Sequence, residues 1–424
     1  MNIQEIKNHI QSGNFDKDFA ILYQDVNSAR ARYTKACDEF VKIYGKKDNV
    51  RIFSAPGRTE VGGNHTDHQH GRVLAGSVDL DIIGVVAVNN DGVVRIKSEG
   101  YPMDEVLLSD LEINKAEFGH ASALIRGMCA NFRKNGHNVN GFDAYTTSSV
   151  MKGSGLSSSA AFEVFIGTTL NYLFNDGRID AVEIAKMSQN SESMYFGKPC
   201  GLLDQSASAL GGFTAIDFKD TTKPVVEKVD FDLASHDHVL CVVNTGGNHA
   251  NLTQDYADIT VECRDVSNFF NKDFLRDVNQ DDFFSRIAKV KAKCGDRAVL
   301  RAIHFFAEDQ RAEDEKQALK DGDFSEFLRL INESGNSSYK YLQNVYSTSA
   351  VNEQGLCLGL ALTERFLKGR GACRVHGGGF AGTIQCFIPS DVLVEYKTLI
   401  ENVFGEGSCY VLKIRPVGGY EIKL

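Results

Sequence analysis

Residues 57–71 bring an arginine, an aspartate and three histidines together between glycines. Burying charged and imidazole groups costs free energy unless they are paired, so packing alone does not explain this mixture. Side chains of these types on a glycine-rich turn indicate a site that holds a polar ligand. Two chemistries fit the pattern, a metal cage or a pocket of hydrogen-bonding groups for a sugar.

Residues 150–161 combine glycines with consecutive serines, and a helical pattern follows. Glycines let backbone N–H groups approach a ligand, and serines at a helix start add hydroxyl donors to the positive end of the helix dipole. A serine-rich N-cap is the alternative, but a cap needs only one Ser or Thr. The segment therefore indicates a phosphate site. It is not a P-loop, because no Gly-Lys-Ser/Thr follows, nor a dinucleotide fingerprint, because Ser158 stands where the third glycine would be.

Two further segments have less specific patterns. Residues 197–205 form a turn that leads through Asp204 into a run of small residues, and this aspartate either caps a helix or takes part in catalysis. Residues 376–382 place four glycines between two strand-like runs, as a tight turn or as part of a site.

The composition narrows the class of protein. With 424 residues and 42% hydrophobic content, the chain fills more than one core, and its length suggests two or three domains. The net charge of −10 opposes binding to nucleic acid. The start lacks the basic-then-apolar order of a secretion signal, and no apolar run approaches membrane-spanning length. We therefore expect a cytoplasmic protein without nucleic-acid or membrane partners.

The elements that must position these segments alternate between helical and strand-like patterns. Residues 1–45 have helical spacing. Strands are expected at residues 50–55, 82–89 and 93–97, the last two joined by a hairpin turn at 90–92, and later at 238–244, 372–376, 382–388 and 409–414. Helices are expected at residues 121–135, 158–174 and 181–195 and within 255–321. The order predicts an α+β protein of two lobes, with the boundary near residues 218–238.

In this order, the four segments resemble those of the galactokinases in the GHMP small-molecule kinase family. Residues 55–67 are similar to the galactokinase signature, 153–161 to the family's phosphate loop, 200–205 to its catalytic turn and 377–382 to its C-terminal glycine motif. His249, Tyr256 and Cys263 also keep the seven-residue spacing around the sugar-contacting tyrosine of galactokinases.

The resemblance implies a fold and a reaction. After the helical lead at residues 1–45, which the apolar spacing predicts, it implies an N-terminal kinase domain with a βαβ core at 46–225 and a ferredoxin-like C-terminal domain at 226–424, with the active site in the cleft between the two kinase domains. The implied reaction transfers the γ-phosphoryl group of ATP to the anomeric hydroxyl of galactose and gives galactose 1-phosphate. We expect the protein to be a monomer or a weak homodimer.

The same resemblance implies roles for single residues. Asp204 is expected to be the base or charge partner of the sugar hydroxyl, and Arg58 is expected beside it to stabilise anionic character. The implied sugar contacts are Asn64, His65, Asp67, Gly201 and Tyr256. The implied contacts to the ATP phosphates are Gly153, Ser154, Gly155, Leu156, Ser157, Ser158 and Ser159. Mg²⁺ is expected on Ser158 or Ser159 and on Glu192. Such cationic and N–H groups suit the charged transition state of phosphoryl transfer.

Departures from the family pattern concern the substrate. Asn64 replaces a glutamate that is expected to contact the C6 end of the sugar, and the change trades a charge-assisted hydrogen bond for a neutral one. Galactose remains the first substrate, and galacturonate is the alternative. A glutamate at position 64 would repel the carboxylate of a uronic acid by roughly 4 kcal/mol at about 4 Å and an effective dielectric of 20, and Asn64 removes this repulsion. Further departures are Met151 in the loop and Ile259-Thr260 after the tyrosine.

Two other classes of function compete with a kinase. A metallohydrolase would use the cluster of His65, Asp67, His68 and His70, but the other histidines form no complementary cluster and the serine loop would have no role. A non-catalytic sugar sensor would be expected to lose parts of the catalytic loop, yet Arg58, Asp204 and residues 157–161 are all present. An active kinase is favoured over both.

Overall fold

The computed structural model describes residues 1–150, 155–247 and 252–424. The expected Gly153 and Ser154, Met151 and His249 lie outside these residues. In the described part of the chain, no helix is long and apolar enough to cross a membrane.

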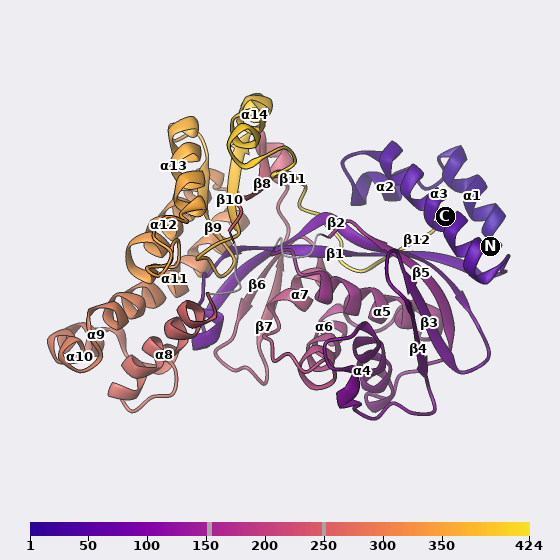
Figure 1. The fold of residues 1–424 in the computed structure, drawn as a ribbon, viewed down its shortest axis with the longest axis horizontal. Coiled ribbons are helices and arrows are strands. Elements are labelled where there is room, and N and C mark those ends of the chain that lie inside the picture. Colours follow the sequence, from indigo (N-terminus) through magenta and orange to yellow (C-terminus); the bar gives the residue numbers. More distant parts are fainter. Residues whose placement is uncertain (151–154, 248–251) are drawn as a thin grey trace.

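The N-terminal lobe is built on a mixed sheet that has eight strands in the described residues. Its main path runs in the order β12-β1-β2-β5-β3-β4, and β6 pairs with β2 and β7. The strands are β1 (Val50–Gly62), β2 (Arg72–Val88), β3 (Val93–Ser98), β4 (Met103–Leu107), β5 (Phe142–Ser148), β6 (Phe213–Asp217), β7 (Val225–Val229) and β12 (Tyr420–Ile422). The long strands β1 and β2 cross the middle of the molecule and extend toward the other lobe (Figure 1).

Helices cover both faces of this sheet, because successive side chains of a strand point to opposite sides. On β1, Ile52 packs with the N-terminal helices, whereas Phe53 packs with the helices of the opposite face. The first group is α1 (Ile3–Ser12), α2 (Asp16–Leu22) and α3 (Val26–Tyr44). The second group is α4 (Ala121–Lys134), α5 (Ser158–Phe174), α6 (Ala181–Asn190) and α7 (Leu203–Leu210). Figure 1 shows the two groups on opposite sides of the sheet.

The predicted hairpin at residues 90–92 is wrong. The strands on either side of this turn, β2 and β3, do not pair, because β5 lies between them. β5 pairs antiparallel with β2 and parallel with β3, and the chain reaches it from β3 through β4 and α4. The connection between the parallel strands β3 and β5 is thus a helix-containing crossover of the kind that parallel strands require.

The C-terminal lobe has a four-stranded antiparallel sheet in the order β11-β8-β10-β9. Its strands are β8 (His238–Asn244), β9 (Ala372–His376), β10 (Thr383–Pro389) and β11 (Cys409–Leu412). Its helices are α8 (Thr253–Phe269), α9 (Gln280–Ser285), α10 (Ile287–Cys294), α11 (Asp296–Asp321), α12 (Phe324–Ser337), α13 (Gly355–Leu367) and α14 (Leu393–Phe404). The helices between β8 and β9, the β9–β10 pair and α14 before β11 give the βαββαβ order of a ferredoxin-like lobe, so this expectation is confirmed.

The division of the chain at residues 45 and 225 stays a prediction. The expected boundary loop at residues 219–224 joins β6 to β7 within the first sheet. The last strand, β12, returns to the same sheet and pairs with β1. Sheet membership therefore favours a boundary after Val229 and assigns Tyr420–Ile422 to the N-terminal lobe.

Candidate active site

Arg58 and Asp204 lie in contact although they are far apart in the sequence. Arg58 is on β1 and Asp204 is in the first turn of α7. Arg58 Nε donates to Asp204 Oδ1 at 2.6 Å, and Ser157 Oγ donates to Asp204 Oδ2 at 2.5 Å. Burial raises the pKa of Asp204, but the guanidinium charge and the hydrogen bonds from Arg58 and Ser157 outweigh it, so the pKa lies below its usual value. The carboxyl group is therefore ionised at neutral pH.

The described part of the serine loop lies beside this pair. The backbone N–H of Arg58 donates to Leu156 O at 3.0 Å, and the Arg58 guanidinium donates to Gly155 O. Ser157 has a left-handed backbone with φ of 55° and precedes the first residue of α5, Ser158. The N-terminus of a 17-residue helix thus faces the same region as the Arg58–Asp204 pair, and its free N–H groups favour an anion there. The side chain of Leu156 is buried, so its own contribution to a ligand is limited to its backbone.

Glu192 forms the second polar centre near the start of α5. It was expected within a helix over residues 181–195, but α6 ends at Asn190 and Glu192 lies in a π-helical turn over Ser191–Tyr195. Such turns are frequent at functional sites. Glu192 Oε1 accepts from Ser159 Oγ at 2.8 Å and from Lys198 Nζ at 2.9 Å. Its other oxygen accepts from Gln205 Nε2 at 2.7 Å.

Glu163, one helical turn after Ser159, lies behind this centre. Gln205 Nε2 also donates to Glu163 Oε2 at 3.2 Å. Burial, followed by the negative charge of Glu192, raises the pKa of Glu163 well above its usual value. The centre therefore has the Glu192 carboxyl group, which pairs with Lys198, and behind it a second carboxyl group, Glu163, whose pKa is raised.

His65 and Tyr256 approach each other at the junction of the lobes. His65 Nε2 lies 2.9 Å from Gly378 O, and the two aromatic rings are 6.0 Å apart between centroids. Tyr256 OH donates to Gly379 O at 3.3 Å. Gly378 has no space for a side chain, because an added Cβ would lie 2.1 Å from Tyr256 Cε1. The glycine segment at residues 376–382 therefore supports both expected sugar contacts.

The expectation that the Asn64 side chain contacts a sugar does not agree with its surroundings. Asn64 is completely buried, and its amide is used inside the protein. Its Nδ2 donates to Glu60 Oε1 at 2.9 Å and to Gly377 O at 2.7 Å, and its Oδ1 accepts from Asn344 Nδ2 at 2.8 Å and from Ser338 Oγ at 3.2 Å. Both amide hydrogens and both acceptor positions are occupied, so Asn64 joins the signature turn to the C-terminal lobe.

Asp67 and Gly201 line a cavity of about 300 Å³. Its lining also includes Lys186 and Gln189 of α6 and residues of the loop before β7. Because neither Arg58 nor Asp204 lines this cavity, it adjoins the expected sugar site and does not coincide with it.

Three residues of the site were not assigned a role from the sequence. Glu60 lies two residues after Arg58 on β1, Lys198 pairs with Glu192, and His376 Nε2 lies 3.0 Å from Thr59 Oγ1. Burial, followed by the charge of Arg58, lowers the pKa of His376 to about 3, so this histidine is neutral. Glu60 could have been chosen from the sequence, because it is an acidic residue within the signature. The pairing of Lys198 with Glu192 could not, because it depends on the geometry of the turn.

The histidine cluster does not form a metal cage within the described residues. No group of three or more His, Cys, Asp or Glu side chains there is arranged to hold a metal ion. His65 bonds to Gly378 O, and His70 stacks on Phe274 with 3.5 Å between ring centroids.

Comparison with known proteins supports the reading of the motifs. The model of the GHMP kinases N terminal domain matches residues 123–212, and that of the galactokinase galactose-binding signature matches residues 38–88. A galactokinase of Clostridium tetani is 28% identical over 374 residues, which cover 87% of this chain and 91% of that protein. A galactokinase of Actinobacillus pleuropneumoniae is 29% identical over 376 residues, covering 87% and 92%.

Solved structures with the same fold include a galactokinase and mevalonate kinases. The Lactococcus lactis galactokinase complexed with galactose has a TM-score of 0.74 at 24% identity and covers 90% of this chain and 98% of its own. The Methanococcus jannaschii mevalonate kinase has a TM-score of 0.61 at 14% identity, covering 87% and 99%. At these identities the structures establish the fold.

The two lobes, the serine-capped helix and the Arg58–Asp204 pair between them agree with the fold and motifs of small-molecule kinases of the GHMP type, whose N-terminal domain model matches this chain. Within that class, the signature on β1 and β2 and the relatives along the chain are those of galactokinases. The chain is therefore similar to the galactokinases of the GHMP kinase family over 87% of its length.

Proposed function

We propose that this protein is an ATP-dependent galactokinase, which transfers the γ-phosphoryl group of ATP to the anomeric hydroxyl of galactose. The observation that carries the proposal is the contact of Asp204 with both Arg58 and Ser157. This contact brings together the sugar signature on β1, the catalytic turn at α7 and the phosphate loop before α5. An acceptor hydroxyl and a phosphate would therefore meet there.

In the proposed reaction, Asp204 orients the sugar hydroxyl and carries the negative charge that attracts its proton. Its lowered pKa makes it a weak base, so charge stabilisation contributes more than early removal of the proton. Arg58 lies against the same carboxylate and also contacts Gly155 of the loop, so its cation is close to the γ-phosphoryl group during transfer. In this proposal, the sugar hydroxyl replaces Ser157 Oγ as the hydrogen-bond donor to Asp204 Oδ2.

The residues around Glu192 fit a magnesium ion. Carboxylate and hydroxyl oxygens are the ligands that Mg²⁺ prefers, and Glu192 and Ser159 already lie 2.8 Å apart beside the start of α5. When bound, Mg²⁺ would neutralise charge on the ATP phosphates. Ser158, at the first position of α5, is the alternative hydroxyl, and the raised pKa of Glu163 disfavours a second negative charge behind the centre.

His65, Tyr256, Asp67 and Gly201 are proposed to hold the sugar ring. Burial, followed by the neighbouring His68, lowers the pKa of His65, so its ring is neutral. Nε2 donates to Gly378 O, which leaves Nδ1 as an acceptor. Burial, followed by Glu60, raises the pKa of Tyr256 to about 12, so its hydroxyl keeps its proton. These are neutral donors and acceptors suited to sugar hydroxyls.

The test is ADP release from purified protein, Mg²⁺ and ATP with a panel of free hexoses and uronic acids. We expect turnover with galactose and the appearance of galactose 1-phosphate. Turnover with uronic acids alone would replace galactose by galacturonate as the substrate. ATP binding without turnover on any sugar would favour the non-catalytic sensor.

A further inference from the structure

An acidic side chain, Glu60, lies beside Asn64. Asn64 stands where a carboxylate was expected to meet the C6 end of the sugar, but its amide is completely buried and fully bonded to the protein. One of its bonds, from Nδ2 at 2.9 Å, goes to the carboxylate of Glu60. An acidic group therefore lies next to position 64, supplied from four residues earlier.

Only one of the two Glu60 oxygens is bonded within the described residues. Oε1 accepts from Asn64 Nδ2 and from Arg374 Nη2, the latter at 2.7 Å. No donor in the described ranges bonds Oε2, and the Glu60 side chain is 16% exposed while Arg374 and Asn64 are fully buried. Asn64 and Arg374 thus hold the carboxylate through Oε1, and in the described residues Oε2 has no protein donor.

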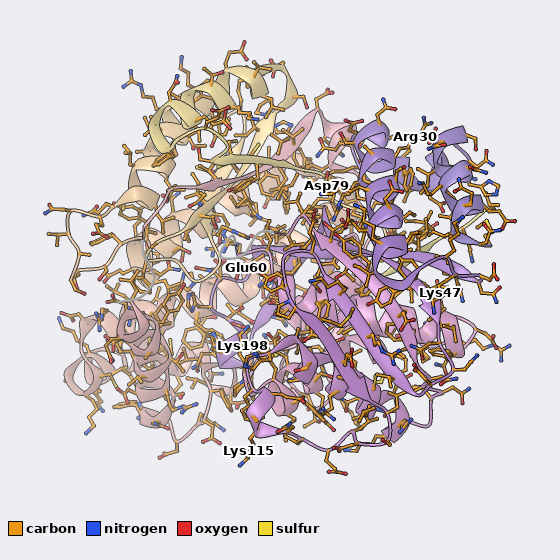
Figure 2. All side chains as sticks on the ribbon, turned by 45° about the vertical axis from the view of Figure 1, so that its right-hand side comes forward. Arg30, Lys47, Glu60, Asp79, Lys115 and Lys198 are labelled. Atoms are coloured by element: carbon orange, nitrogen blue, oxygen red, sulfur yellow. The ribbon has the colours of Figure 1, made fainter. Side chains whose placement is uncertain are left out.

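Glu60 lies on the same face of β1 as Arg58. Arg58 and Glu60 are separated by two positions on β1, and side chains two apart on a strand point to the same face. The Glu60 charge raises the pKa of Tyr256 after burial, and it also acts on His65, so it is close to both expected sugar contacts. Figure 2 labels Glu60 near the centre of the molecule, where the two lobes meet.

The spacing along β1 fits a single sugar ring. Two residues of a strand span about 6.6 Å, so Glu60 lies roughly one hexose away from the point where Arg58 and Asp204 meet the anomeric hydroxyl. A ring held at one end by Asp204 would bring its far end, with the C6 hydroxyl, toward Glu60 Oε2.

We propose that Glu60 receives the C6 hydroxyl of the sugar and selects neutral hexoses against uronic acids. This inference rests on the proposed galactokinase activity. The carboxylate accepts a charge-assisted hydrogen bond from a C6 hydroxyl, and it repels a C6 carboxylate. The absence of an acidic side chain at position 64 therefore does not make this site a uronate site.

The experiment compares wild type and Glu60→Gln on galactose, 6-deoxygalactose and galacturonate. A charge-assisted hydrogen bond corresponds to about ten- to a hundredfold in affinity, so wild type should prefer galactose to 6-deoxygalactose by that factor in kcat/KM. Glu60→Gln should lower kcat/KM for galactose about tenfold and leave 6-deoxygalactose within about twofold. It should raise the galacturonate-to-galactose ratio by about a hundredfold, because repulsion between two carboxylates is removed.

The outcome distinguishes a sugar contact from a bridge between the lobes. If Glu60 serves only to pair Arg374, Glu60→Gln lowers kcat/KM equally for galactose and 6-deoxygalactose, and the proposal is overturned. Glu262→Gln is the matched control, because Glu262 Oε2 pairs with the buried Arg301 at 2.8 Å in the C-terminal lobe. It should change the three substrates in parallel and by less than about threefold.

Two further measurements keep the test independent of folding and of turnover. Glu60→Asp retains the charge but shortens the side chain, so it should still reject galacturonate while losing affinity for galactose. Calorimetric binding of the three sugars should follow the same order as kcat/KM. Sugar binding in that order without turnover would refute the proposed kinase activity and support the role of Glu60 in sugar selection. Turnover on galactose with no effect of Glu60→Gln would support the kinase activity and refute the role of Glu60.

Discussion

Asp204→Asn tests the point at which the three motifs meet. The substitution keeps the size of the side chain and one acceptor for Arg58, but it removes the charge that faces the acceptor hydroxyl. Positioned acid–base and charge partners contribute at least about a hundredfold, which corresponds to about 2.7 kcal/mol in the activation free energy. We therefore expect kcat to fall by at least about a hundredfold, with the KM for ATP changed by less than about threefold.

The same substitution has a smaller cost in stability. Arg58 is 15% exposed and Asp204 28% exposed, so their ion pair is partly screened by solvent. Leaving the guanidinium without its counter-charge should cost about 1–2 kcal/mol in the free energy of unfolding. Urea unfolding measures this loss, and it is too small to unfold the protein under assay conditions.

Asp309→Asn provides the control for a lost arginine partner. Asp309 on α11 is 13% exposed and pairs with Arg72 and Arg276. Its substitution should lower stability by a similar amount and leave kcat within about twofold, measured by the same coupled ADP assay with galactose. A kcat for Asp204→Asn that matches the Asp309→Asn value would refute the assigned role of Asp204.

The remaining predictions concern the metal, the sugar and the lobe contact. Glu192→Gln removes one expected ligand, so the Mg²⁺ concentration for half-maximal rate should rise at least tenfold in a magnesium titration. Gly378→Ala should raise the KM for galactose more than the KM for ATP, because the new methyl group would displace Tyr256; equal changes would contradict this. Burial would raise the pKa of Glu308, but His304, Arg311 and Arg374 lower it from 4.5 to about 2. The ionised carboxylate therefore stabilises the fold at neutral pH. This stabilisation is lost as the pH falls from about 4.5 toward 2. Glu308→Gln should therefore cost about 3 kcal/mol at pH 7 and less than half of that at pH 3, as measured by urea unfolding.

The local patterns were sufficient for the motifs and for the individual elements. The helix at Ser158 follows from a long apolar pattern after a serine-rich start, and the structure begins α5 at that residue. The contact between Arg58 and Asp204 followed from the family resemblance alone, because no local pattern relates residues that are 146 positions apart.

The pairing of β2 with β5 could not be predicted from local sequence. An Asn-Asp-Gly turn between two strand-like runs has the same local chemistry whether or not its strands pair. The choice depends on α4, whose buried residues Leu124, Ile125 and Met128 pack in the core beneath the sheet and carry the chain to β5. Such a contact is formed only in the assembled lobe.

The surroundings of Asn64 were equally out of reach, since its partner Asn344 lies 280 residues away. The same geometry explains why the residues at positions 60 and 64 of the signature depend on each other. A carboxylate at position 64 would face Glu60, whose Oε1 lies 2.9 Å from Asn64 Nδ2, and it would also face the carbonyl of Gly377 in place of a donor. Two carboxylates and a carbonyl in a completely buried position would repel one another. Glu60 therefore requires a neutral amide donor at position 64, and Asn64 meets this requirement.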